Sequence, residues 1–577
     1  MVDTNLTKAF TKTSSLILAA VLLTGTITSS GLLGLGVHDA LGSTSIDISQ
    51  ELEQEIYGCN DSTCNNAETN DADTFSNEFF SSGSALGFVR QFIGQNIEDV
   101  EDNSDVDNIG ENEGALEDVT GFLLLQAIFQ NAKSIKNSDV LNEGINDAFP
   151  SDSVLVAVGQ LISQNAEEIR NSDATNRALS DADIQGNSIL SAIFQGSIQN
   201  IEHVNDDSSA ANQATNDAEI TDSAAALAGQ LNIQNIEKID DGSTVSNSGF
   251  NTASVREAEG ALVLQGNIQS IKDIVATTDA FNSATNFAEI LDDSDNNEVR
   301  QENDQLIKEV RNSRLADNLG TNTAIIDLNS DNNAVYQKNK QEIRNVDDSL
   351  DTENTAQNFA TIDDNSNNND ISQINKQKIN GVDDGSDADN DAENNAELHQ
   401  TSDTNADQIN KQEIKDVDDG STAFNTAGNQ LETDRNSGGQ VDQTNEQKIK
   451  DVDDGSSAEN NANNDLFLGI ASNNNDVDQT NEQKIKDVDD GSSAENNAEN
   501  NADIRTGSDD NDVDQKNKQE IKNVDDGSDA SNDAINEVDI SNDSDNNDVD
   551  QETHQKIDGV DGGSSARNSG GNSVNIS

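Results

Sequence analysis

The stretch that decides the fold is VDQTNEQKIKDVDDGSSAENNAENNADIRTGSDDND, residues 477–512. In its first part every second residue is apolar or carries an amide: Val477, Gln479, Asn481, Gln483 and Ile485. A period of two is typical of a strand with one buried face. Asp489-Asp490-Gly491-Ser492 then favours a turn, residues 494–504 alternate again, and residues 508–511 return the chain. We therefore predict a unit of strand, arc, strand and arc.

A pair of glutamines four residues apart marks this unit along the whole chain. Its second member recurs fifteen times, with steps of 34 to 36 residues after a first step of 41, at Gln54, Gln95, Gln130, Gln164, Gln199, Gln234, Gln269, Gln305, Gln341, Gln377, Gln412, Gln447, Gln483, Gln519 and Gln555. Such self-similarity indicates stacked units. The prediction is an all-β, parallel β-solenoid of about fifteen coils of 35–36 residues.

Stacking in register would place identical amides above one another. Each side-chain amide can then donate to its equivalent one coil away, as in cross-β assemblies, which satisfies a buried polar column. The predicted inward ladder residues of this unit are Gln479, Asn481, Gln483, Asn496 and Asn500. A helix is the alternative, since Gln-x-x-x-Gln also lies on one helical face, above all in residues 122–129. The dense Asn and Ala alternation of residues 494–504 argues against a helix.

The composition bounds the class of partner. The chain has a formal net charge of -79, one Pro, no Trp and 3% aromatic residues. Such a composition also fits disorder of the free monomer, but a random acidic chain has no reason to keep register. Halophilic adaptation would explain the acidity too, although the excess is in Asp and Asn rather than Glu. Nucleic acid is excluded as a partner, because phosphate binding needs clustered Lys and Arg.

The chain divides into three predicted parts. Residues 1–42 read as a signal peptide with Lys8 and Lys12 before an apolar run, so we expect an extracellular or cell-surface location. The alternative is a retained membrane anchor at residues 14–37. Residues 43–290 are expected to be solenoid repeats with an apolar outer face, and residues 291–577 polar repeats with Asn/Gln ladders. The outer face would contact a second layer, another subunit or cell-surface components through Leu123, Leu125, Phe129, Leu190 and Phe194.

Two groups of residues could carry chemistry. Cys59 and Cys64 are the only cysteines and are expected to form a disulfide across the first arc. The arcs would stack carboxylates into columns that hard cations such as Ca²⁺ can bridge, with the candidate ligands Asp453, Asp454, Asp489, Asp490, Asp525 and Asp526. Diffuse counterion screening is the alternative. Nucleophile motifs, phosphate loops and His-Cys metal clusters are missing from the sequence, so we do not expect an enzyme.

The Gln-x-Asn-x-Gln and Asn-x-Ala-x-Asn patterns resemble the curlin repeats of curli fibre subunits and the repeats of the Fap fibril subunit. The resemblance covers residues 46–576 as a pattern and implies a secreted functional amyloid. The repeat here is longer than that of curlin, and the glycine between Gln and Asn is missing. Both ends of the repeat array lack a polar cap, which favours self-assembly into a fibre of a cell-surface or biofilm matrix. The alternatives are a monomeric acidic adhesin or stalk, and a carbohydrate-processing β-helix enzyme.

Overall fold

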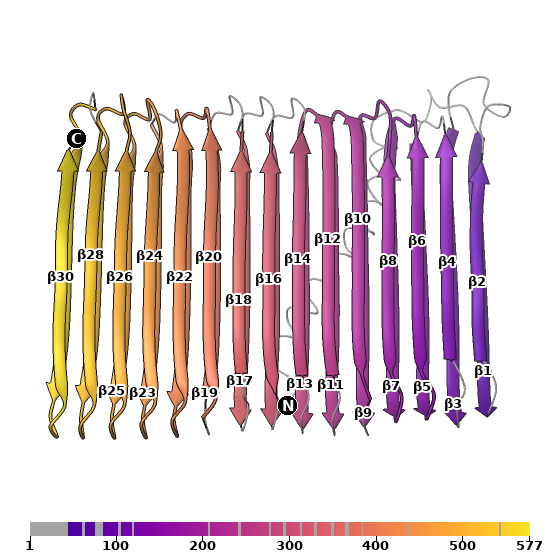
Figure 1. Cartoon of the computed structure of the whole chain (residues 1–577). Helices are drawn as coiled ribbons and strands as arrows, with labels where there is room; N and C mark the ends of the chain where they lie inside the picture. Colours follow the sequence, from indigo (N-terminus) through magenta and orange to yellow (C-terminus); the bar gives the residue numbers. More distant parts are fainter. Residues whose placement is uncertain are drawn as a thin grey trace.

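The computed structural model describes residues 44–60, 64–74, 85–101, 106–117, 121–205, 208–240, 244–275, 279–291, 296–311, 314–327, 332–347, 351–363, 368–382, 385–435, 438–541 and 544–576. These residues form two 15-stranded parallel sheets that lie face to face (Figure 1). Strands of one sheet run opposite to those of the other, and the coils follow the sequence from one end of the molecule to the other. The predicted signal peptide lies outside the described residues.

Sheet A holds the odd-numbered strands: β1 (Thr44–Asn60), β3 (Ala85–Glu101), β5 (Gly121–Lys136), β7 (Leu155–Arg170), β9 (Leu190–Asn205), β11 (Ala226–Asp240), β13 (Ala261–Val275), β15 (Glu298–Arg311), β17 (Ala334–Asp347), β19 (Asp370–Val382), β21 (Asn405–Val417), β23 (Gln440–Val452), β25 (Asp476–Val488), β27 (Asp512–Val524) and β29 (Asp548–Val560).

Sheet B holds the even-numbered strands: β2 (Cys64–Thr74), β4 (Val106–Glu117), β6 (Val140–Ser151), β8 (Ala174–Ile184), β10 (Ala210–Ser223), β12 (Thr244–Ala258), β14 (Asp279–Leu291), β16 (Leu315–Ile326), β18 (Asp351–Ile362), β20 (Asp387–His399), β22 (Thr422–Asp434), β24 (Ser457–Leu468), β26 (Ser493–Ile504), β28 (Asp529–Ile540) and β30 (Ser565–Ile576).

The register confirms the β-solenoid. Gln479 pairs with Gln515 in sheet A and Asn496 with Asn532 in sheet B, so each strand lies on its equivalent one repeat away. The helix that residues 122–129 allowed is not formed, because they belong to β5. Each coil therefore contributes one strand to each sheet, and its buried face is the one that the alternation predicts.

The interior of a coil has three zones across its width. In the coil of β25 and β26, Val477 and Ile504 join one continuous apolar column, and Ile485 and Val488 join a second column at the opposite edge. Between these columns lie the buried amides of both sheets. The apolar columns keep water from the amides, which must then be satisfied by protein partners.

The amides are satisfied by ladders along the stack and by bonds across it. Gln479 Nε2 donates to Gln443 Oε1 at 2.8 Å, and also to the main-chain oxygen of Asn501 in the facing sheet at 3.0 Å. Asn481 Nδ2 donates to Asn517 Oδ1 at 3.1 Å and to Asn500 Oδ1 across the interior at 2.9 Å. Each carboxamide therefore joins neighbouring coils and also joins the two sheets.

The interior ladders have opposite polarities. The glutamine amides donate toward the N-terminal coils, as from Gln483 to Gln447 at 2.9 Å. The asparagine amides donate toward the C-terminal coils, as from Asn500 to Asn536 at 2.9 Å. Glutamine and asparagine dipoles therefore run antiparallel, which offsets their fields inside a low-dielectric interior.

The early coils fill the centre with apolar side chains. Ile93, Ile128 and Ile162 form a separate buried cluster at the place of the later asparagine column. Glycine faces these bulky residues: a Cβ atom on Gly144 would lie 2.8 Å from Ile162 Cγ2. The asparagine column begins at Asn232, which donates to Asn267 at 3.0 Å. This central column therefore changes from apolar to asparagine side chains well before residue 291, where the polar repeats were predicted to begin.

The ladder can be tested by an isosteric substitution. Asn481 is fully buried, so Asn481→Asp should cost several kcal/mol of unfolding free energy at neutral pH, because an inward carboxylate meets amide oxygens and has no counter-ion. Protonation should relieve this loss, since burial raises the pKa of such a carboxyl. Chemical denaturation at neutral and acidic pH measures both effects.

The control is Glu482→Gln on the same strand. Glu482 points outward and pairs with Lys518 at 2.7 Å, with 47% of its side chain exposed, so its loss should cost less than about 1 kcal/mol. Equal stability of the two variants would contradict the inward placement of Asn481.

Candidate functional site

The Asp-Asp-Gly-Ser arcs form tight turns in which both central residues are left-handed. Asp490 has φ 49° and Gly491 φ 80°, and the Ser492 N–H donates to the Asp489 carbonyl at 3.2 Å. Asp and Gly tolerate this backbone better than other residues. The Asp489 carboxylate also accepts the Asp490 N–H at 2.9 Å. The arcs therefore form the turns that were predicted from the sequence, and the left-handed backbone and the Asp489 carboxylate bond specify their geometry.

The stacked arcs bring the predicted cation ligands together. Carboxylate oxygens of Asp453, Asp454 and Asp490 lie within 4.8 Å of one another, as do those of Asp489, Asp490 and Asp526. Repulsion by Asp489, together with desolvation, raises the pKa of Asp490. Hard cations take carboxylate oxygens as ligands, and these columns have the spacing to offer them. Asp525, the remaining candidate, accepts the Asp526 N–H at 3.0 Å, as Asp489 does in its own turn.

A carboxylate-lined groove of about 730 Å³ runs beside the arcs. It is lined by arc residues such as Asp453 and Asp489, and also by Asp416, Asp451 and Asp487. Asp416, Asp451 and Asp487 have φ 57° each. The equivalent residue of every other described coil is also left-handed. Desolvation and the charges of Asp416 and Asp487 raise the pKa of Asp451. The groove therefore concentrates negative charge along the stacking axis.

Of the two cysteines in the predicted disulfide, only Cys64 has its side chain among the described residues. Cys64 is buried and disulfide-bonded. The side chain of Cys59, its expected partner, lies outside the described residues. The Cys59–Cys64 pairing therefore stays a prediction.

The predicted apolar outer face lies on sheet A, across β5 and β9. Phe129 is 39% exposed and Leu190 41%, whereas Leu123, Leu125 and Phe194 are half-buried. Glycines on neighbouring strands let the rings lie flat: a Cβ atom on Gly229 would lie 2.9 Å from the Phe194 ring. Part of this face is hollowed, because a shallow groove of about 440 Å³ is lined by Phe92, Gly94 and Phe129.

Most of the positive charge lies on sheet A, and this distribution was not predicted from the sequence. Among the described residues, every lysine lies on an odd-numbered strand, and the strands of sheet B carry only Arg177, Arg256 and Arg567. Sheet B therefore presents carboxylates with few counter-charges. The signal was present in the sequence, because each lysine lies next to a repeat glutamine or a few residues from it.

The carboxyls of sheet B respond to this environment. Burial raises the pKa of Asp317 to about 7, with further contributions from Glu353 and Asp351. Burial likewise raises the pKa values of Asp147 and Asp389 to about 6 each. These side chains lose hydration on the outer face of the sheet without gaining a lysine partner.

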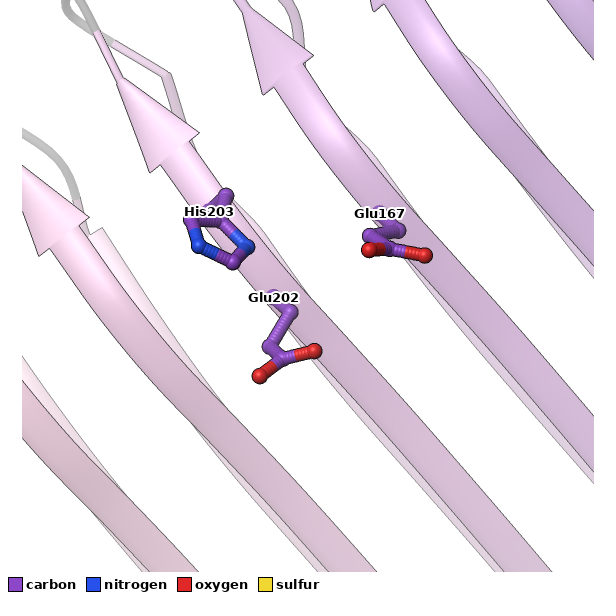
Figure 2. Close-up of side chains that lie close together, drawn as sticks. All are labelled: Glu167, Glu202 and His203. Atoms are coloured by element: carbon purple, nitrogen blue, oxygen red, sulfur yellow. The ribbon is translucent and has the colours of Figure 1, made fainter.

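Glu167, Glu202 and His203 form a cluster of possible metal ligands on the outer face of sheet A (Figure 2). Their ligand atoms lie within 4.8 Å of one another, on the neighbouring strands β7 and β9. Both carboxylates already pair with lysines: Glu167 with Lys133 and Glu202 with Lys238, at 3.1 Å each. A cation would have to displace two ammonium groups, so we assign the cluster as an ion-pair network.

Comparisons with protein-family models, curated proteins and solved structures find no match to the chain. Among the residues that the structure describes, we find no helix with the length and apolarity needed to cross a bilayer. The fold and geometry define the chain as a repeat β-solenoid.

The raised pKa of Asp317 predicts a pH-dependent stability. The raised pKa lets the folded state hold the Asp317 proton up to about pH 7, whereas an ordinary Asp has a pKa of 3.8. The loss of stability caused by ionising Asp317 is therefore absent below pH 3.8 and complete above about pH 7. Asp317→Asn should raise the unfolding free energy on the order of 1 kcal/mol at pH 8, after solvent screening, and leave it unchanged at pH 3.5. Destabilisation at pH 8 would contradict this account.

Proposed function

We propose that the chain is an exported structural protein whose solenoids assemble into fibres of a cell-surface or biofilm matrix. The observation that carries the proposal is the exposed edge of the coil of β29 and β30 within the described residues. Val574 and Ile576 of β30 are 46% and 74% exposed, whereas the equivalent Val538 and Ile540 of β28 are 0% and 7% exposed. Another coil placed on this end would bury the same columns again.

Both ends of the described stack support self-assembly. β1 and β2 at one end, and β29 and β30 at the other, each have a strand neighbour on one side only within the described residues. Unpaired edges of this kind recruit further strands. Because the two ends of a polar stack differ, repeated contact between them generates an open filament rather than a closed ring.

The interior supports a structural role rather than catalysis. Its polar groups are engaged in ladders, as Gln479 and Asn481 are, and the grooves described above are open and acidic. We propose no catalytic function. The pattern-level resemblance to curlin repeats agrees with this proposal.

The proposal predicts that the purified chain forms unbranched fibres with a meridional reflection near about 4.8 Å, the strand spacing. Gln555→Lys should abolish or strongly delay assembly, because the ammonium would be buried in the next contact but remains hydrated in the monomer. Gln555 lies in the last coil, and its amide donates to Gln519 at 2.8 Å. Electron microscopy and diffraction measure the outcome.

The matched control is His554→Lys, which places the same side chain on the outward side of β29. This variant should assemble at least as readily as the parent does, because the added ammonium stays outside the buried ladder. A parent chain that stays monomeric at high concentration would contradict the fibre proposal.

The apolar face supports a second candidate, a monomeric adhesin or stalk. Phe129 and Leu190 are exposed on a flat sheet, and the rings of Phe92 and Phe129 lie 5.2 Å apart. Exposed apolar surface of this kind is typical of contact with another macromolecule. A monomeric parent chain that binds cell surfaces through this face would favour this candidate.

We further propose that divalent cations stabilise the stacked arcs. CaCl₂ should raise the melting midpoint more than NaCl of matched ionic strength, since site binding depends on ligand concentration whereas screening depends on ionic strength alone. Replacing Asp454 and Asp490 by Asn, which keeps the left-handed turn, should remove the difference. Asp503→Asn, which removes a carboxylate paired with Arg505 at 3.3 Å, should retain it. Identical midpoints of the parent in the two salts would contradict cation binding.

A further inference from the structure

We infer that copies of the chain join head to tail in one register, with the coil of β29 and β30 placed on β1 and β2 of the next copy. This inference rests on the proposed assembly and specifies the contact that would carry it. In the continued register, Gln551 meets the next copy's Gln50 and Asn568 meets its Asn66. The polarity of the amide ladders and the outward charges favour this register.

The C-terminal end presents glutamine acceptors and asparagine donors. Gln551 Nε2 donates back to Gln515 Oε1 at 2.9 Å, so the Oε1 atom of Gln551 faces the open end. Asn568 Oδ1 accepts from Asn532 Nδ2 at 2.9 Å, so the Nδ2 group of Asn568 faces that end. A planar amide that uses one of its atoms inward presents the other outward.

The N-terminal end presents the complementary set. Gln50 Oε1 accepts from Gln91 Nε2 at 3.0 Å, so the NH₂ group of Gln50 faces away from the stack. Asn66 Nδ2 donates to Asn108 Oδ1 at 3.0 Å, so its Oδ1 atom faces away. Head-to-tail contact then continues both ladders with a donor against each acceptor. Contact between two N-terminal ends would oppose donors to donors in the glutamine columns.

One outward column of charges continues favourably in the same register. Lys484, Glu520 and Lys556 alternate in charge along one column of sheet A, and Glu520 contacts Lys484 at 2.5 Å and Lys556 at 3.9 Å. The next position in this column is Glu55 of the following copy. In the neighbouring column, His554 would face Glu53. The opposite-charge neighbours of Glu520 and Lys556 are therefore continued across the contact in this column, whereas Glu552 would face Glu51 in another column.

In this register Thr553 meets Leu52, a polar side chain against an apolar one. The Thr553 hydroxyl donates to Asn572 Oδ1 at 2.8 Å and accepts from Asn536 Nδ2 at 3.1 Å. Its hydrogen bonds are thus made within its own molecule, and Leu52 can cover it without leaving an unpaired polar group.

A charge reversal tests the register. Lys556→Glu places like charges against Glu55 and should raise the concentration needed for half-maximal assembly about fivefold. The double variant Glu55→Lys, Lys556→Glu should return it to within about twofold of the parent. Rescue can arise only between copies, because the two residues lie at opposite ends of the stack (Figure 1).

A cross-link gives a second readout. Glu55→Cys with Lys556→Cys should give a ladder of covalent oligomers with a short bismaleimide, whereas the parent should give none. Ser49→Cys with Lys556→Cys should not, because six residues of a strand separate the two positions by about 20 Å. Failure of the parent to assemble overturns both the proposed function and this inference. Fibres without charge rescue, or with equal cross-linking at Ser49, overturn the inference alone.

Discussion

The structure depends on one constraint, which is that a buried carboxamide must find both a donor and an acceptor without water. Gln479 and Asn481 each meet it by donating to the equivalent residue of a neighbouring coil and to an acceptor in the facing sheet. That solution fixes the register, since a shift by one residue would turn the amides outward. It also explains why apolar columns flank the amides on both sides: they exclude the competing solvent.

Charge then restricts how such stacks can meet one another. The arcs and sheet B carry carboxylates with few counter-charges, and the described lysines lie on sheet A. Like charges on the sides oppose contact through sheet B or the arcs. The ends are different, because they expose apolar columns and amides whose partners repeat in every coil. In the proposed assembly, the acidity therefore favours growth along the axis over lateral clumping.

Much of this architecture could be predicted from the sequence, because a period of two and a repeat of 34 to 36 residues leave few alternatives. The inward positions around Gln483 follow from that pattern, and the structure places them there. The polarity of the ladders could not be predicted, since an amide offers a donor and an acceptor in either direction. The turns at the arcs could be predicted, whereas the left-handed backbone of Asp490 and the bond from its N–H to the Asp489 carboxylate could not.

The most direct test of the ladder is hydrogen exchange of the side-chain amides, followed by NMR on the folded protein. The account predicts that the NH₂ groups of Gln479, Asn481 and Gln483 exchange only through opening of the stack, as slowly as the neighbouring backbone amides. Gln430, which is exposed on the outer face of β22, should exchange as fast as a free amide. Fast exchange of the three inward amides in a folded chain would contradict the central claim.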